Sequence, residues 1–204
     1  MKAMRPDEYC LVAKPAVIED PMRKPSQEPI LQTRRLILRP PVMADFSRWA
    51  EMMSDAEAAR FLGGAQPPEV TWRVFMTMAG AWSLTGIGMF SVLDRESGQW
   101  MGRVGPWRPL GWPGNEIGWG LHPEAQGRGI AQEAATAAID FAFDALDWSH
   151  IIHCIAPDNV PSQRLAQRLG SALLGPAQLP PPGHGVTVNR WGQSRVDWRA
   201  RRNS

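Results

Sequence analysis

The segment HPEAQGRGIAQEAATAAIDFAF, residues 122–143, places a glycine on either side of Arg128 directly before a run of helix-forming residues. Apolar positions then recur at helical spacing, which predicts a helix from residue 130 to about 146. The preceding NEIGWGLH, residues 115–122, is typical of a strand. A strand that enters a helix through a glycine turn brings unpaired backbone N–H groups and the positive end of the helix dipole to one place. The segment therefore predicts an anion-binding site at the start of the helix.

Gly127 and Gly129 suit a phosphate because they lack a Cβ and tolerate a positive φ, and Arg128 adds a full charge. The alternative is that the glycines only permit a sharp turn. Two familiar phosphate-binding patterns do not match. A P-loop requires a Lys followed by Ser or Thr, and a Rossmann fingerprint requires a third glycine where Gln132 stands.

Composition narrows the class of protein. The chain has 204 residues, of which 44% are hydrophobic and 21% charged, which predicts one sizeable core. A net charge of +2 argues against nucleic acid as a partner. Cys10 and Cys154 are far apart, so neither a disulfide framework nor a metal site is expected. Without an apolar stretch of about 18 residues we expect no membrane span, and a cytoplasmic location.

The rest of the chain mixes strands and helices in an α+β order. The proline-rich residues 1–29 predict an extended arm, and residues 30–204 a single domain. Strands are expected within 33–40, 88–94, 99–110, 115–122 and 150–156, with two short ones near 186–191 and 194–200. Helices are expected within 43–53, 67–82 and 160–169. In the second of these, the expected buried face consists of Val70, Val74, Met78 and Trp82.

Three ordered segments resemble one family. Gln126-Gly127-Arg128-Gly129-Ile130-Ala131 is similar to the Q/R-x-x-G-x-G/A pyrophosphate loop of the GNAT superfamily of acyl-CoA N-acyltransferases. LQTRRLILRP (31–40), NEIGWGLHPEAQGRGIAQEA (115–134) and NVPSQRLAQRLG (159–170) resemble its ribosomal-protein N-terminal acetyltransferase (Rim-type) branch. The resemblance spans about residues 31–199. It implies a mixed, mostly antiparallel central sheet flanked by helices and splayed between the strands near 115–122 and 150–157.

The resemblance also implies acetyl-CoA as cosubstrate, an amine acceptor, and direct attack of the amine on the thioester. A backbone N–H donor from the strand near 118–122 would polarise the thioester carbonyl. The cofactor-binding residues it implies are Leu121, His122, Gln126, Gly127, Arg128, Gly129, Ile130, Ala131 and Asn159.

Two side chains are candidates for proton transfer. Glu116, on the strand where GNAT members often place a glutamate, is the candidate base, and its alternative role is a solvated carboxylate at a strand end. Many members use a tyrosine to protonate the departing thiolate, but the only tyrosine here is Tyr9, in the N-terminal arm. Ser162 is the best remaining donor unless it only caps its helix. Asn159 is compatible with both cofactor binding and an N-cap role.

Other polar residues have weaker claims. His122 is a candidate to assist deprotonation or a structural residue, and Arg103 and Arg108 are candidates to meet a substrate carboxylate. His153 and Cys154 are expected in or near the core. The tryptophans of the strand region fit either an aromatic acceptor pocket or a packed core. They are Trp100, Trp107, Trp112 and Trp119.

Two classes of function remain open. The first is an N-acetyltransferase acting on a small molecule or a protein N-terminus, and the second is a catalytically silent acyl-CoA-binding sensor, because the tyrosine is missing. The sequence also leaves a homodimer open.

Overall fold

The computed structural model describes residues 29–181, 183 and 186–202. The arm expected over residues 1–29 therefore lies, apart from Pro29, outside the described residues, and Tyr9 lies outside them too.

The described residues form one eight-stranded sheet in the order β1-β2-β3-β4-β5-β6-β8-β7. All neighbouring strands pair antiparallel except β5 and β6, which are parallel. The expected fold class, a mostly antiparallel sheet that opens between the strands near 115–122 and 150–157, is confirmed. The strands are β1 (Leu31–Gln32), β2 (Leu36–Arg39), β3 (Phe90–Asp94), β4 (Trp100–Trp107), β5 (Glu116–Leu121), β6 (His150–Ile155), β7 (Ala172–Gln178) and β8 (Thr187–Ser194).

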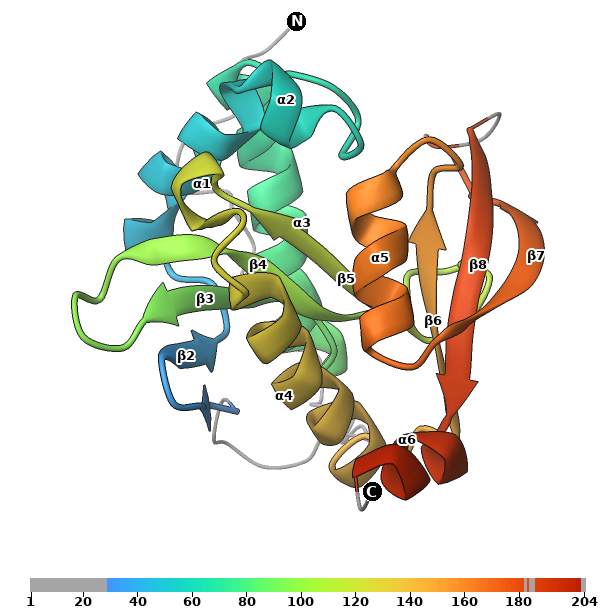
Figure 1. Cartoon of the computed structure of the whole chain (residues 1–204). Helices are drawn as coiled ribbons and strands as arrows, with labels where there is room; N and C mark the ends of the chain where they lie inside the picture. Colours follow the sequence, from blue (N-terminus) through green and yellow to red (C-terminus); the bar gives the residue numbers. More distant parts are fainter. Residues whose placement is uncertain (1–28, 182, 184–185, 203–204) are drawn as a thin grey trace, which may run out of the picture.

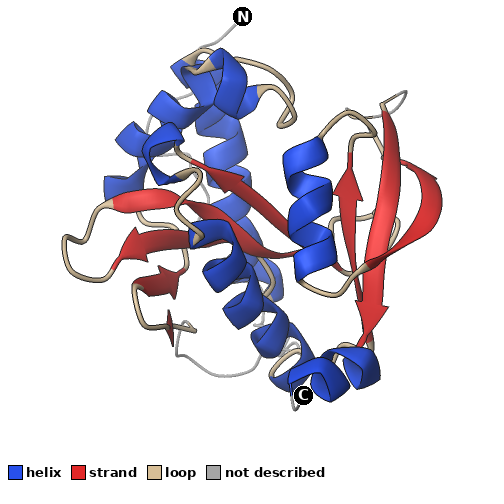
Figure 2. Cartoon of the chain, viewed as in Figure 1, coloured by secondary structure: helices blue, strands red, loops and turns tan. Residues whose placement is uncertain are grey.

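Helices cover both faces of this sheet. In Figures 1 and 2, α4 and α5 lie in front of the sheet and α3 lies behind it, while α6 packs below α4. The helices are α1 (Phe46–Ser54), α2 (Ala56–Ala59), α3 (Pro68–Thr85), α4 (Ile130–Asp144), α5 (Val160–Arg168) and α6 (Arg195–Arg202), with short 3-10 turns at Met43–Asp45 and Pro123–Ala125.

The main core lies between α4 and the middle of the sheet. Ala134, Ala135 and Ala138 of α4 are fully buried there, and small side chains let the helix axis approach β4 and β5 closely. This packing holds the N-terminus of α4 near the end of β5, to which it is joined by the turn at 122–129.

Most predicted elements are present. The hairpin of β3 and β4, the strands β2, β5 and β6, and the helices α4 and α5 lie within the ranges that the sequence predicts. The helices α1 and α3 are present too, but they extend beyond the predicted ends, to Ser54 and Thr85. Of the two strands expected near the C-terminus, the one near 186–191 is part of β8.

The strand expected near 194–200 is wrong, because these residues form α6 with Ser194 at the end of β8. Trp198 and the arginines on this helix bind α4: the Trp198 indole donates to Asp140 (2.7 Å) and Arg199 pairs with Asp144 (2.7 Å). The sheet edge β7 was not expected from the sequence at all. Its residues ALLGPAQ contain a glycine and a proline, which weaken any strand pattern.

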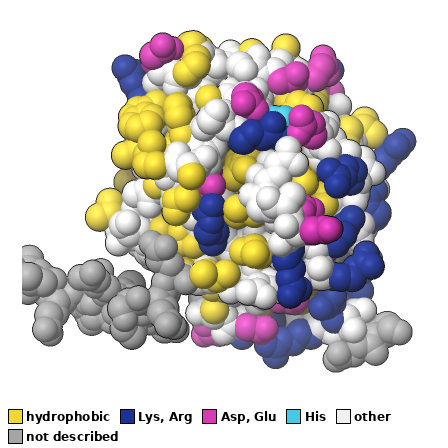
Figure 3. All heavy atoms as spheres, turned by 90° about the vertical axis from the view of Figure 1, so that its left-hand side faces the viewer, with side chains coloured by type: hydrophobic (Ala, Val, Ile, Leu, Met, Phe, Trp, Pro, Cys, Tyr) yellow, Lys and Arg dark blue, Asp and Glu magenta, His cyan; other side chains and the backbone are white. Residues whose placement is uncertain are grey.

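The buried face of α3 agrees with the expected one at Met78 and Trp82, while Val74 is only partly buried and Val70 is not buried. Thr71, Phe75, Met78 and Trp82 are buried, whereas Val70 is 40% exposed. A strict spacing of four residues drifts around a helix of 3.6 residues per turn, and the buried stripe instead alternates steps of four and three. Val70 joins Trp72 and Met76 among the exposed apolar residues of α3. Figure 3, in which the left-hand side of Figure 1 faces the viewer, shows hydrophobic side chains gathered on that face of the molecule.

Candidate active site

The site is built around the point where β5 and β6 separate. Within the described residues the two strands share a single register pair, Glu116 with Ile152, and the Ile152 N–H donates to the Asn115 carbonyl (2.8 Å). Beyond this pair two side chains bridge the strands. The Glu116 carboxylate accepts the backbone N–H of Cys154 (3.2 Å), and His153 Nδ1 lies 2.7 Å from the Ile117 carbonyl. Each strand thus supplies a side chain to a backbone group of the other at the fork, which satisfies groups that would otherwise lack a partner.

The backbone of β5 beyond the fork faces the opening. The His122 N–H donates to the Met101 carbonyl (3.0 Å), and β4 and β5 stay in one-to-one register from 116 to 121. Because antiparallel pairs alternate, Gly118 and Gly120 direct their backbone groups to β4, while Trp119 and Leu121 direct theirs toward the β6 side. Two backbone N–H groups are therefore available where β6 has moved away.

Glu116 lies at the bottom of the opening between β5 and β6. Its side chain is buried, and its second oxygen accepts the indole N–H of Trp112. Burial raises the pKa of Glu116 to about 7, against the opposing effect of its hydrogen bonds from Cys154 and Trp112. The alternative role of a solvated strand-end carboxylate is wrong, because Glu116 is only 7% exposed. A carboxyl group with this pKa exchanges a proton near neutral pH.

The glycine turn has the geometry that anion binding requires. Gly127 has φ +71° and Gly129 has φ +76°, both in the left-handed region. A Cβ on Gly127 would meet no atom within 4 Å, so this side of the turn is open. The first helical bond of α4 is donated by the Glu133 N–H to the Gly129 carbonyl (3.2 Å). The N–H groups of Ile130 and Ala131 precede it and carry the positive end of the helix dipole.

Arg35 holds this turn in place through hydrogen bonds to α4 and to the turn itself. Its Nε donates to Glu133 in α4 (2.7 Å), and its Nη1 donates to the carbonyl of Arg128 in the turn (3.0 Å). Gln126 also donates from its side chain to the Leu121 carbonyl (3.3 Å). The turn is thus fixed both to the start of the sheet and to the end of β5.

Ser162 and Asn159 lie across the opening from β5. Asn159 is the N-cap of α5, since its side chain accepts the Ser162 N–H (3.2 Å). The Ser162 hydroxyl accepts the indole N–H of Trp119 (3.0 Å), and the Trp119 ring lies 4.8 Å from the ring of His153. No residue in the described part of the chain accepts the Ser162 hydroxyl proton, so it is free to be donated.

The remaining candidate residues contact other protein groups or lie in the core. His122 is buried beside α1, with Nδ1 3.3 Å from Arg48 and Nε2 3.6 Å from Glu51. Arg108 is exposed and donates to the Asn115 side chain (3.4 Å). Burial lowers the pKa of His153 to about 4 and raises that of the Cys154 thiol, so neither group is charged near pH 7. Both lie in or beside the core, as expected.

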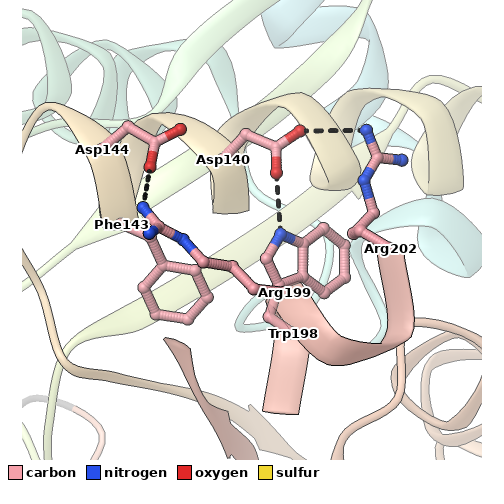
Figure 4. A pocket seen from close by; sticks show the side chains of 6 residues that line it. All are labelled: Asp140, Phe143, Asp144, Trp198, Arg199 and Arg202. Atoms are coloured by element: carbon pink, nitrogen blue, oxygen red, sulfur yellow. Dashed lines mark hydrogen bonds and ion pairs between the residues drawn. The ribbon is translucent and has the colours of Figure 1, made fainter. Parts of the chain in front are cut away.

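Another pocket lies between α4 and α6 and is shown in Figure 4. Its carboxylates are already engaged: Asp144 pairs with Arg199, and Asp140 binds both Trp198 and Arg202. These contacts describe the docking of the last helix rather than a site for a ligand. The residues that line it are Asp140, Phe143, Asp144, Trp198, Arg199 and Arg202.

Three residues contribute to the site in ways that the sequence did not indicate. Trp112 and Trp119 place their indole N–H groups on Glu116 and Ser162, whereas the sequence suggested only an aromatic pocket or a core. Arg35 reaches the glycine turn from the bend between β1 and β2, 93 positions before Arg128. A spacing pattern within one segment carries no signal for contacts of this range.

None of the helices in the described ranges is both long and apolar enough to span a membrane. Over the same ranges, no group of three or more His, Cys, Asp and Glu side chains is arranged to hold a metal ion.

An open α+β sheet, parallel only where it splays and followed there by a glycine turn and a helix, defines the acetyltransferase class of fold. A family model described as acetyltransferase (GNAT) domain matches residues 35–172. The chain belongs to this family and is a GNAT acetyltransferase.

Individual relatives agree with this assignment. The "uncharacterized N-acetyltransferase YnaD" of Bacillus subtilis is 26% identical over 140 residues, which cover 69% of this chain and 81% of that protein. An acetyltransferase structure from Agrobacterium tumefaciens superimposes with a TM-score of 0.72 at 30% identity, over 85% of this chain and 98% of that one. A structure titled a putative ribosomal-protein-serine acetyltransferase, from Vibrio cholerae, has a TM-score of 0.68 at 20% identity, covers 81% of this chain and 97% of that one, and shows the fold alone.

Proposed function

We propose that this acetyltransferase transfers the acetyl group of acetyl-CoA to a primary amine by direct attack, in the opening between β5 and β6. The observation that carries the proposal is the meeting of three features at that opening. They are the open glycine turn at the start of α4, the backbone N–H groups of β5 that face away from β4, and the buried carboxyl group of Glu116.

Coenzyme A binds first through its diphosphate in this proposal. The N–H groups from Gly127 to Ala131 receive the phosphate oxygens, and Gln126 and Arg128 flank them. The left-handed φ values of the two glycines and the brace from Arg35 support this role, because they hold the turn ready for an anion. Asn159 lies across the opening at the start of α5.

The pantetheine arm then enters the opening, beside Leu121 and His122. The Trp119 and Leu121 N–H groups, which lack a β6 partner at their level, are suited to donate to the arm and to the thioester carbonyl. A donor placed before the reaction stabilises the negative charge that forms on this oxygen in the tetrahedral intermediate.

Glu116 accepts the proton that the amine loses as its nitrogen forms the new C–N bond. The C–S bond then breaks, and the thiolate of coenzyme A takes a proton from the Ser162 hydroxyl, which regains one from solvent. A pKa of about 7 supports Glu116 as the base, since the carboxylate is well populated at neutral pH and still basic enough to accept a proton. The Trp119 indole supports Ser162 as the donor, because its hydrogen bond stabilises negative charge on the hydroxyl oxygen.

The acceptor is a small molecule or a protein N-terminus. The Rim-type resemblance of the sequence favours a protein N-terminus, whereas the buried Arg103 on the same sheet face as Glu116 favours a small acceptor.

Release of the free thiol of coenzyme A, measured over a panel of amines together with binding of acetyl-CoA, tests the proposal. We expect acetyl-CoA to bind and at least one amine to release the thiol at a rate well above hydrolysis. Thermal stabilisation by coenzyme A without turnover on any amine would favour a silent acyl-CoA sensor instead. Absence of binding would contradict both functions.

A further inference from the structure

Arg103 of β4 is a buried cation that forms no ion pair with any residue the structure describes. It is 7% exposed, its Nε has no hydrogen-bond partner in the described part of the chain, and its Nη1 contacts only the thioether sulfur of Met89 (2.8 Å). The guanidinium lies 5.5 Å from the ring of Trp49, whose own indole N–H is buried and has no hydrogen-bond partner among the described residues either. Two residues with unsatisfied buried donors therefore pack against each other.

Arg39 of β2, a partly buried arginine of the same sheet, is by contrast paired with a carboxylate. Arg39 makes two hydrogen bonds of 2.7 Å to the two oxygens of Asp45. Burying a guanidinium without such a partner is costly, because the weak thioether contact does not replace its lost hydration. Burial accordingly lowers the pKa of Arg103 to about 10, with Glu116 opposing the shift. An oxyanion that enters this space would supply the missing partner.

The space around Arg103 continues to Glu116. Arg103 pairs with Gly120 across the β4–β5 ladder, so it lies on the sheet face shared by residues 116, 118 and 120. A Cβ on Gly120 would lie 3.7 Å from Arg103 Nε, and a Cβ on Gly118 would lie 3.5 Å from the Glu116 carboxylate. The two glycines thus form a floor, free of side chains, between the candidate base and the buried cation.

Two flexible side chains fill the space over this floor. A Cβ on Gly118 would collide with the terminal methyl of Met89, and one on Gly120 would lie 2.9 Å from a methyl of Leu62. The thioether of Met89 thus lies between Glu116 and Arg103. Methionine is unbranched and adapts its rotamers readily, so Met89 is a side chain that can move to admit a ligand.

We propose that Arg103 binds a carboxylate of the acceptor, so that the acceptor is an amino acid or a related amine that carries a carboxylate on the same molecule. Its amine lies toward Glu116 and its carboxylate replaces the Met89 sulfur at Arg103. This inference rests on the proposed function for the position of the amine, but the carboxylate site stands on the surroundings of Arg103 alone. Arg103 is then a specificity-determining residue and takes no part in proton transfer.

Binding to the protein loaded with coenzyme A tests the proposal without requiring turnover. Calorimetric titrations compare matched ligands of several chain lengths, such as 5-aminopentanoate with pentylamine and with pentanoate. We expect the amino acid of the fitting length to bind about ten- to a hundredfold more tightly than the neutral-tailed amine, because a charge-assisted hydrogen bond is gained. Arg103→Met removes this preference, and Arg103→Lys retains part of it. Arg108→Met, at an exposed arginine, leaves it unchanged.

Turnover and stability add independent readouts. With an accepted amino acid, Arg103→Met raises KM while kcat stays within a few fold, because the carboxylate is held equally in the ground and transition states. Without ligand, Arg103→Met unfolds at a higher temperature than the wild type, since an unpaired buried charge has been removed.

The outcomes separate this inference from the proposed function. Equal binding of amine and amino acid at every length, or a preference that survives in Arg103→Met, overturns the carboxylate site even if amines are acetylated. Carboxylate-dependent binding without turnover on any amine supports the site and contradicts the proposed reaction.

Discussion

The Glu116 carboxylate and the backbone N–H of Cys154 lie 3.2 Å apart across the point where β5 and β6 separate. The same carboxyl group thus accepts a backbone N–H where the ladder between β5 and β6 ends, and it lies at the bottom of the candidate active site. Its burial, which raises its pKa, follows from this double position. One residue thus bridges the opening of the sheet and has the raised pKa on which its proposed role as the base depends.

Replacing Glu116 by Gln keeps an acceptor for the Cys154 N–H and removes the base. We expect the kcat/KM of the wild type to rise with pH through an inflection near 7, where Glu116 loses its proton. In Glu116→Gln this inflection disappears and the plateau rate falls by about 10² or more, in the range of general base catalysis. A pH–rate profile on one amine measures both effects. A wild-type profile in the variant would show that another group accepts the proton.

Glu116 and His153 should make opposite contributions to stability as the pH changes. The pKa of Glu116 is raised from 4.5 to about 7 on folding, so its contribution is present below pH 4.5 and is lost as pH rises toward 7. The pKa of His153 is lowered from 6.5 to about 4, so its contribution is present above pH 6.5 and is lost as pH falls toward 4. Each difference corresponds to about 3 kcal/mol at most.

Denaturant unfolding over pH 4–7.5 can separate the two groups. In Glu116→Gln the free energy of unfolding should fall more steeply toward low pH than in the wild type, because only the His153 effect remains. In His153→Asn it should fall more steeply toward neutral pH, because only the Glu116 effect remains. Parallel curves for all three proteins would mean that these groups are not buried as the structure places them.

Ser162→Ala should slow acetyl transfer while the affinity for coenzyme A stays close to that of the wild type. The reason is that the hydroxyl is assigned to the departing thiolate, whereas the cap of α5 comes from Asn159 and the backbone. Trp119→Phe is the matched variant, since it keeps an aromatic ring beside His153 but removes the N–H that binds Ser162. It should produce a smaller loss in the same direction. A wild-type rate in Ser162→Ala, measured by thiol release, would leave Ser162 only its place in α5.

Cys154→Ala should retain transfer activity, although Cys154 lies next to Glu116 in space. Burial raises the pKa of the Cys154 thiol, so the nucleophilic thiolate is absent at neutral pH and an acetyl-enzyme on this residue is not expected. Initial-velocity kinetics should accordingly show intersecting rather than parallel lines. Loss of activity in Cys154→Ala together with parallel lines would indicate a covalent route.

The sequence predicts the local elements of the site better than their contacts. The glycine turn and the start of α4 were predictable because Gly127, Gly129 and the alanine pattern all act within one segment. The links from Trp112 to Glu116 and from Trp119 to Ser162 were not, because packing of distant elements decides where an indole N–H finds an acceptor.

Local patterns also failed where tertiary contacts override them. The segment near 194–200 alternates like a strand, yet it forms α6 because Trp198 and Arg199 bind α4. In α3 the expected buried face is right at Met78 and Trp82 but wrong at Val70, because a spacing of four residues does not follow one face of a helix for long.

The central claim is that the turn at 126–131 binds the diphosphate of coenzyme A, and calorimetric titration of coenzyme A into two glycine variants tests it most directly. Gly129 and Gly98 have similar φ values, +76° and +71°, so replacing either by Val imposes similar backbone strain, but only Gly129 lies in the turn. We predict that Gly129→Val loses most of the affinity for coenzyme A while Gly98→Val binds like the wild type. Equal affinity in all three proteins would contradict the account.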